Sequence, residues 1–191
     1  MDKRAEQLIE NWRKRKIEGF FCADKDEASK KLLELIPVPT SIGFSGSQTL
    51  EQIGIIKKLA ERGNKVFDPY KIGLSKEESL KARKLGSCAD FYLASANALS
   101  ENGELVFLSA YGNRTSGIAY ADQVIIVCGI NKIVPDLEKA LERAREFAAP
   151  LNCKRLNWES VSSMCCQTLV IEGEVVPGRL KVILVGEDLG F

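Results

Sequence analysis

The chain has 191 residues, 45% hydrophobic and 28% charged, and its 27 Lys and Arg nearly balance its 26 Asp and Glu. This length suits one domain with its own core, and a near-neutral chain lacks the broad basic field that nucleic acids and acidic membranes select, so we expect neither as a partner. The sequence contains no histidine, which excludes Ser-His-Asp and Cys-His catalysis and His-ligated zinc.

The N-terminal segment reads as a helix at 3–18 with a single apolar stripe among many charges. The stripe consists of Ala5, Leu8 and Trp12. We expect residues 1–22 to form a charged amphipathic helix and lead-in, placed on the surface of the domain or on a partner. The remainder, 23–191, is then one α/β domain.

Short apolar runs and amphipathic stretches alternate through the rest of the chain. The predicted strands lie at 40–44, 66–67, 91–93, 105–108, 124–128 and 182–185. The predicted helices lie at 25–36, from about 48 to 63, from 75 to about 86, and from 135 to a stop at Pro150, after which 150–167 reads as loop. This alternation predicts a predominantly parallel sheet with helices on both faces, whose ligands bind at the carboxyl ends of the strands.

A glycine- and hydroxyl-rich loop at 41–49 follows the first predicted strand. Glycines let backbone N–H groups approach an anion, and hydroxyls add donors. The predicted ligand-binding residues here are Gly43, Ser45, Gly46, Ser47 and Thr49. The loop is neither a Walker loop nor Gly-x-Gly-x-x-Gly, and a plain tight turn with a Ser45/Gln48 capping box explains it equally well.

Polar residues flank the predicted strand at 91–93. Asp90 precedes it, Asn97 follows it, and Glu101 stands before an Asn-Gly pair. The Asn-Gly pair alone is better explained as a hairpin turn. That explanation does not cover Asn97, because an amide in an apolar stretch needs hydrogen-bond partners.

Cationic residues follow two further strands. Gly112, Asn113 and Arg114 come after the strand at 105–108, and Asn131 and Lys132 come after the strand at 124–128. A guanidinium can bind a carboxylate or phosphate through two hydrogen bonds, although a lone arginine is more often part of a surface ion pair. We expect these residues to meet Gly46 and Asn97 in one pocket for a small anion.

The cysteines show no Cys-x-x-Cys spacing. They are Cys22, Cys88, Cys128, Cys153, Cys165 and Cys166. Most are expected to be small buried side chains, and a disulfide framework is not expected in a chain with this much core and no signal peptide. No apolar run approaches the ~20 residues of a membrane span, so we expect a cytoplasmic protein.

Several of these segments together resemble the LUD-domain family of lactate utilization proteins, over roughly residues 25–191. The matching segments are the loop at 41–50, the stretch 89–103, Gly-Asn-Arg at 112–114, Gly-Ile-Asn-Lys-Ile-Val-Pro-Asp at 129–136, Ala-Pro-Leu-Asn at 149–152 with Lys154 and Arg155, and the run at 185–191. The resemblance implies a fold like that of ribose-5-phosphate isomerase, glucosamine-6-phosphate deaminase and coenzyme A transferases. Many members carry several spaced cysteines before the last strand, whereas here only Cys165 and Cys166 remain there, with Cys153 upstream; their redox or metal role stays open.

Three functional hypotheses follow. The resemblance implies a component of the oxidation of L-lactate to pyruvate, working with iron–sulfur partner subunits, in which Arg114 and Lys132 would hold a carboxylate. No cofactor signature is visible in the sequence itself.

The second hypothesis is a stand-alone enzyme. Ser-Glu-Asn-Gly at 100–103 is similar to the coenzyme A transferase motif whose glutamate is the nucleophile, which makes Glu101 a candidate for acyl-coenzyme A chemistry, although Glu104 departs from that motif. Asp90 or Glu101 could equally be the base of a sugar-phosphate isomerase. The third hypothesis is a metabolite-binding module without catalysis.

Overall fold

A computed structural model describes residues 3–157 and 166–191. Its centre is a six-stranded sheet in the order β1-β10-β7-β4-β2-β3, in which every pairing is parallel. In that order the strands are β1 (Glu18–Cys22), β10 (Leu180–Val185), β7 (Gln123–Gly129), β4 (Phe91–Ala94), β2 (Ser41–Phe44) and β3 (Lys65–Phe67). The predicted α/β class with a predominantly parallel sheet is confirmed.

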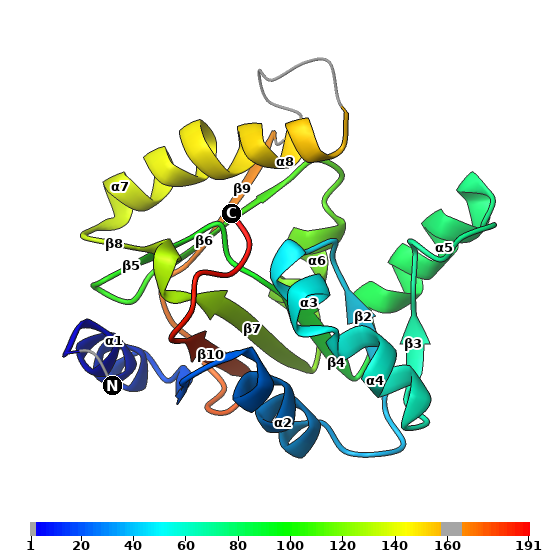
Figure 1. Cartoon of the computed structure of the whole chain (residues 1–191), viewed down its shortest axis with the longest axis horizontal. Helices are drawn as coiled ribbons and strands as arrows, with labels where there is room; N and C mark the ends of the chain where they lie inside the picture. The colour runs from blue at the N-terminus through cyan, green and yellow to red at the C-terminus, as the bar shows by residue number, and fades with distance from the viewer. Residues whose placement is uncertain (1–2, 158–165) are drawn as a thin grey trace.

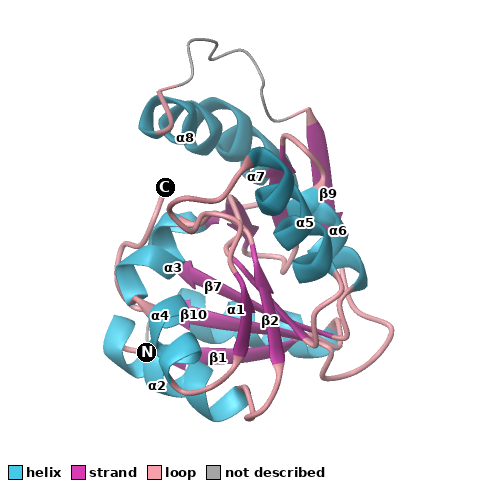
Figure 2. Cartoon of the chain, turned by 90° about the vertical axis from the view of Figure 1, so that its right-hand side faces the viewer, coloured by secondary structure: helices cyan, strands magenta, loops and turns pink. Residues whose placement is uncertain are grey.

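Helices cover both faces of this sheet, as Figures 1 and 2 show from two directions. Three pack on one face: α2 (Lys25–Leu35), α3 (Gln48–Ile53) and α4 (Ile55–Glu61). Three others lie toward the opposite face: α1 (Lys3–Lys14), α5 (Lys76–Ser87) and α6 (Asn113–Tyr120). Strand β7 shows why both faces need cover, because Val124 and Ile126 enter one apolar cluster whereas Ile125 and Val127 enter the other.

A second, smaller sheet follows the order β8-β5-β6-β9 and packs beside the first. Its strands are β8 (Ile133–Val134), β5 (Ala98–Ser100), β6 (Leu105–Ser109) and β9 (Gln167–Ile171). A continuous helical segment covers it, made of α7 (Leu137–Glu142), a π-helical turn (Arg143–Ala148) and α8 (Ala149–Arg155). A short 3₁₀ turn (Ile130–Lys132) joins β7 to β8.

The N-terminal segment belongs to the domain. Strand β1 pairs with β10 at the edge of the main sheet. On α1, Leu8 and Trp12 are fully buried in the core, and the indole N–H of Trp12 donates to Gly103 O at 3.1 Å. The expected division at residues 22 and 23 therefore does not separate two structural units.

Strands β1, β5, β8 and β9 and helix α6 were not predicted. Two differences in helix bounds have local causes. Gly54, in the left-handed region at φ 68°, divides the helix predicted from 48 to 63 into α3 and α4. The predicted stop at Pro150 is wrong. In the π-helical turn the Ala149 N–H bonds to Ala144 O, and Pro150 then enters the first turn of α8, where it needs no N–H.

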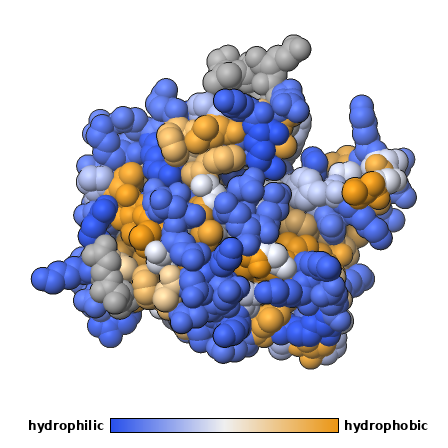
Figure 3. Space-filling view, in the orientation of Figure 1, coloured by the Kyte–Doolittle hydropathy of each residue, from blue (hydrophilic) through white to orange (hydrophobic). Residues whose placement is uncertain are grey.

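The face of the molecule in Figure 3 is mostly hydrophilic, with smaller apolar patches between the helices. This is expected, because the apolar faces of the main sheet are turned toward helices. Among the helices of the described residues, none has the length and apolar character needed to cross a membrane.

Candidate anion-binding site

The loops that follow β2, β4 and β7 meet in a small cavity of about 40 Å³, here called the anion pocket. These are three carboxyl strand ends of a parallel sheet, where ligands of such sheets bind. Six of the predicted residues line it: Gly46, Ser47, Thr49, Asn97, Arg114 and Lys132. The structure thus brings together four segments that lie far apart in the sequence.

Lys132 lies at the floor of the anion pocket with only 3% of its surface exposed. Its Nζ donates to Ser95 Oγ at 2.8 Å, to Ala96 O at 3.1 Å and to Thr49 Oγ1 at 3.2 Å. All three partners are uncharged. Burial lowers the pKa of Lys132 from 10.5 to about 8; the Cys128 thiol nearby opposes this shift, and Arg143 and Arg114 add to it.

Arg114 projects from the first turn of α6 into the space between β2 and β6. Its guanidinium donates to Gly46 O at 2.8 Å, Leu108 O at 3.0 Å, Ser45 Oγ at 3.3 Å and Asn97 Oδ1 at 3.3 Å. These bonds join the loop after β2 to the loop after β4 and to the end of β6. Arg114 is therefore not a surface ion pair but a fixed, partly buried cation.

A third cation, Arg143, reaches the same region from the π-helical turn. It donates to Asn97 O at 2.6 Å and to Asn131 O at 3.1 Å. Within the described part of the chain, none of Lys132, Arg114 and Arg143 forms an ion pair. Carbonyls and hydroxyls satisfy the donors without cancelling the charge, so the pocket has a positive field.

The other predicted ligand-binding residues lie near the anion pocket but not in it. Ser45 and Asn113 line an adjoining cleft. Gly43 packs against α5, where an added Cβ would lie 1.8 Å from Gly86 O. Gly112 has φ 80° at the start of α6, and Asn131 Oδ1 accepts from the Leu189 N–H at 3.2 Å. The geometry gives the last three positions a role in packing and chain direction.

The two residues predicted as catalytic both lie outside the anion pocket. Asp90 stands at the amino end of β4, where its carboxylate accepts from Ser41 N at 2.7 Å and Ser41 Oγ at 2.8 Å. The hydrogen bond from the Ser41 backbone lowers the pKa of Asp90. Glu101 follows β5, at the opposite end of that strand from Asn97, and its carboxylate pairs with Arg4 on α1 at 2.7 Å.

Glu104, the residue that departs from the coenzyme A transferase motif, is buried beside this turn. It accepts from Ser100 Oγ at 2.5 Å and pairs with Arg15 at 2.6 Å. The Ser-Glu-Asn-Gly segment is thus a hairpin turn fixed to the N-terminal helix, as the simpler interpretation of its Asn-Gly pair had it.

The structure adds Ser95, Arg143 and Asn152 to the residues around the anion pocket. Ser95 directly follows β4, so the same rule of carboxyl strand ends could have found it. Arg143 and Asn152 are helical residues without a local signal. Only the packing of the α7–α8 segment over the second sheet brings them here.

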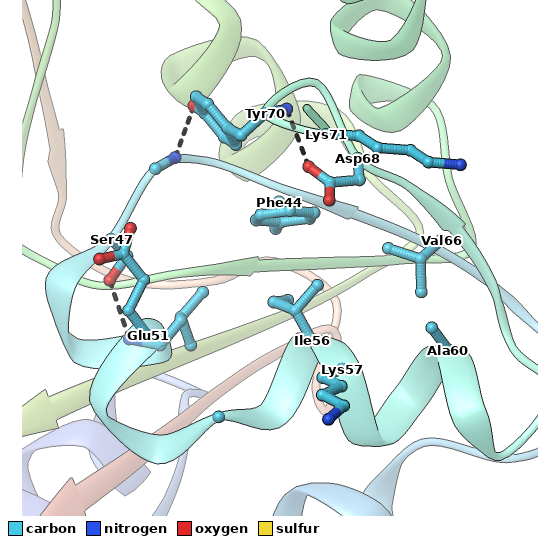
Figure 4. A pocket seen from close by; sticks show the side chains of 13 residues that line it. Phe44, Ser47, Glu51, Ile56, Lys57, Ala60, Val66, Asp68, Tyr70 and Lys71 are labelled. Carbon is cyan, nitrogen blue, oxygen red and sulfur yellow. Dashed lines mark hydrogen bonds between the residues drawn. The ribbon is translucent and has the colours of Figure 1, made fainter. Parts of the chain in front are cut away.

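A larger, mainly apolar cavity of about 650 Å³ lies on the other side of the loop after β2, between that strand, β3, α3 and α4. Figure 4 shows Phe44, Ile56 and Val66 facing this space. The Tyr70 hydroxyl accepts from the Gly46 N–H at 2.7 Å at its edge. Gly46 and Ser47 line both this cavity and the anion pocket, so the loop separates an apolar space from a cationic one.

No group of three or more Cys, Asp and Glu side chains in the described ranges could hold a metal ion. Cys153 is buried and Cys166 is exposed, whereas Cys165 lies outside the described residues.

A family model described as the LUD domain matches residues 5–185. Among solved structures, the chain is similar to the crystal structure of a DUF162 family protein from Deinococcus radiodurans, with a TM-score of 0.60 and 15% sequence identity, over 97% of this chain and 100% of that one. At that identity the likeness shows the fold alone. A search of the curated proteins finds no match.

Proposed function

Because the chain belongs to the LUD-domain family, which is associated with lactate utilization, we propose that it is a component of L-lactate utilization that binds a small carboxylate-bearing anion in the anion pocket. Oxidation of lactate to pyruvate releases two electrons and two protons. We assign acceptance of the electrons to iron–sulfur partner subunits, which the resemblance to lactate utilization proteins implies, and binding of the anion to this chain.

The observation that carries the proposal is a cluster of cations that form no ion pair with the described residues. Lys132 and Arg114 line the pocket, and Arg143 approaches it from the helix above. A carboxylate placed here would gain charge-assisted hydrogen bonds, which are the strong ones. It would also favour the ammonium form of Lys132, which burial disfavours.

The size of the anion pocket supports a small charged group. One buried water molecule needs a cavity of roughly 10–15 Å³. A space of about 40 Å³ therefore suits one carboxylate or phosphate group. The Ser95 and Thr49 hydroxyls accept from Lys132, while Ser95 donates to Thr49 Oγ1 at 3.2 Å and Thr49 donates to Leu189 O at 3.4 Å. Each hydroxyl can exchange this long bond for one to such a group by rotating its proton.

The test is a thermal-shift series with lactate, pyruvate and sulfate at pH 7. We expect each anion to raise the Tm of the wild type, because a ligand that binds only the folded state stabilises it. Arg114→Gln should lose most of the shift. Arg13→Gln is the matched control, since Arg13 lies on the solvent-facing side of α1 with 78% of its side chain accessible and, among the described residues, pairs with Glu10 alone. An equal shift in Arg114→Gln and the control contradicts the proposal.

The positions of Glu101 and Asp90 argue against the alternative of a stand-alone enzyme that uses them. Each carboxylate is held by a structural partner, and neither lines the anion pocket. A binding module without catalysis would also be stabilised by anions in the thermal-shift series. Lactate consumption distinguishes it from the proposed function, because a module would not support that consumption when the partner subunits are added.

A further inference from the structure

A wider cleft of about 300 Å³ opens beside the anion pocket, bounded by α5, α6 and α8. Three arginines line it, one from each helix: Arg83, Arg114 and Arg155. No described residue that lines it is acidic. We call this space the arginine cleft.

Arg83 is the most unusual of the three. Its side chain makes no hydrogen bond or ion pair with the described residues, and its Nε is the one buried side-chain nitrogen or oxygen without a partner among them. Its guanidinium carbon lies 5.9 Å from the centre of the Tyr70 ring and 5.8 Å from that of Tyr111. The two rings attract the cation without satisfying its N–H groups. Buried donors are nearly always paired, so this one points to a missing acceptor.

Arg155 is only weakly compensated. It donates to Asn152 Oδ1 from Nε at 3.3 Å and from Nη2 at 3.1 Å, and its nearest carboxylate oxygen, on Glu51, lies 3.7 Å away. That separation is too long for a hydrogen bond. The arginine cleft therefore carries more positive charge than its own residues neutralise.

The arginine cleft and the anion pocket adjoin each other at shared residues. Both are lined by Gly46, Arg114 and Asn152. Arg114 stands between Lys132 on one side and Arg83 on the other. A Cβ added at Gly46 would lie 3.0 Å from the Tyr70 hydroxyl, so a larger residue at this shared position would crowd the Tyr70 side chain.

We propose that the arginine cleft binds a second anionic group of the ligand held in the anion pocket, and that this second group is a phosphate or diphosphate, so that the ligand carries a phosphate besides the carboxylate. The inference rests on the proposed anion site and narrows the class of its ligand. Guanidinium groups bind phosphate oxygens through two parallel hydrogen bonds, which a single lysine cannot do. A monocarboxylate such as lactate carries one negative charge and would leave Arg83 without an acceptor and Arg155 with only the neutral acceptor Asn152 Oδ1.

Pyrophosphate, phosphate and lactate serve as probes, with affinities measured by calorimetry on the full chain. We expect pyrophosphate to bind the wild type at least tenfold more tightly than phosphate or lactate, and to displace lactate. Arg83→Gln should weaken pyrophosphate at least tenfold while leaving lactate within twofold. Since Arg83 has no hydrogen bond to lose, Arg83→Gln should lower the Tm only by the small amount that its contacts with the Tyr70 and Tyr111 rings contribute. Arg83→Lys provides a second variant, and Arg13→Gln the matched control.

The outcomes separate this inference from the proposed function. If lactate binds but pyrophosphate binds no more tightly, or Arg83→Gln leaves pyrophosphate affinity unchanged, the arginine cleft is not a ligand site and the proposed function stands. If pyrophosphate binds and Arg83→Gln weakens it while lactate and pyruvate do not bind at all, the inference stands and the lactate assignment fails. If no anion binds, both fail.

Discussion

Replacing Lys132 by methionine tests the charge of the anion pocket directly. Methionine keeps the length and much of the bulk of the side chain but removes the ammonium, which is buried among the two hydroxyls and one carbonyl that accept its protons. The charged groups that face it are the guanidiniums of Arg143 and Arg114, with the Cys128 thiol beside it. The informative quantity is how the difference in unfolding free energy, wild type minus Lys132→Met, depends on pH.

The pKa of Lys132 falls from 10.5 in the unfolded chain to about 8 in the folded one. Between these values the unfolded state binds more protons, so the stability that Lys132 contributes rises with pH. Burying the charged ammonium of Lys132 therefore destabilises the fold. This cost is fully present below about pH 8 and is gone above 10.5. From the size of the shift it amounts to about 3 kcal/mol in total, of which about 2–3 kcal/mol should disappear between pH 7 and pH 10.

Urea unfolding at pH 7, 8, 9 and 10 measures this difference. Groups that titrate in both proteins cancel, including Cys22, whose pKa burial raises to about 11. A bound anion favours the ammonium, so the Tm shift produced by sulfate should shrink as the pH rises through 8 in the wild type only. A pH-independent difference in free energy would show that Lys132 keeps an ordinary pKa and would refute the reasoning.

Three further variants test packing and the placement of Glu101. Gly43→Ala puts a Cβ 1.8 Å from Gly86 O and should cost about 1–3 kcal/mol or more, measured by urea unfolding; an unchanged midpoint would show that β2 and α5 are not in close contact. Trp12→Ala removes a fully buried ring and its hydrogen bond and should cost about 3–5 kcal/mol, whereas a loss below 1 kcal/mol would mean that α1 is dispensable. Glu101→Gln breaks an exposed pair with Arg4, so it should change stability by about 1 kcal/mol or less and leave the sulfate-induced Tm shift intact; loss of that shift would return Glu101 to the ligand site.

The meeting of the loops that line the anion pocket could be predicted from the sequence, because residues that directly follow the strands of a parallel sheet lie at the same edge of the sheet. Gly46, Asn97 and Lys132 each follow a strand of the main sheet, β2, β4 or β7. Arg114 follows β6 of the second sheet and reaches the pocket from α6.

The same rule explains why Asp90 and Glu101, which were predicted as catalytic, lie away from the anion pocket. Asp90 precedes β4 and so stands at the amino end of the sheet, away from the pocket. Glu101 does follow a strand, but β5 belongs to the second sheet and pairs antiparallel with β6, so its far end points toward α1. Sequence motifs without the sheet order cannot distinguish these cases.

The arginine cleft could not be predicted at all. Arg83 lies on a predicted amphipathic helix among other charged residues, where helical periodicity treats it as exposed surface. Arg155 falls in the stretch predicted as loop, where periodicity says nothing of its surroundings. What gives them a role is the approach of α5 and α8 to α6, which depends on packing between residues distant in the chain. Whether Arg83 has a partner can be judged only once the contacts between these helices are known.

Across the anion pocket and the arginine cleft, cations are held by carbonyls, hydroxyls and aromatic rings rather than by carboxylates. A carboxylate partner would have stabilised each cation and removed its attraction for a ligand. Neutral partners fix the position of Arg114 and Lys132 but leave the charge uncancelled, at a cost that appears in the lowered pKa of Lys132. If the proposed anion binds here, it offsets this cost, and the variants that relieve the cost should be those that weaken the ligand.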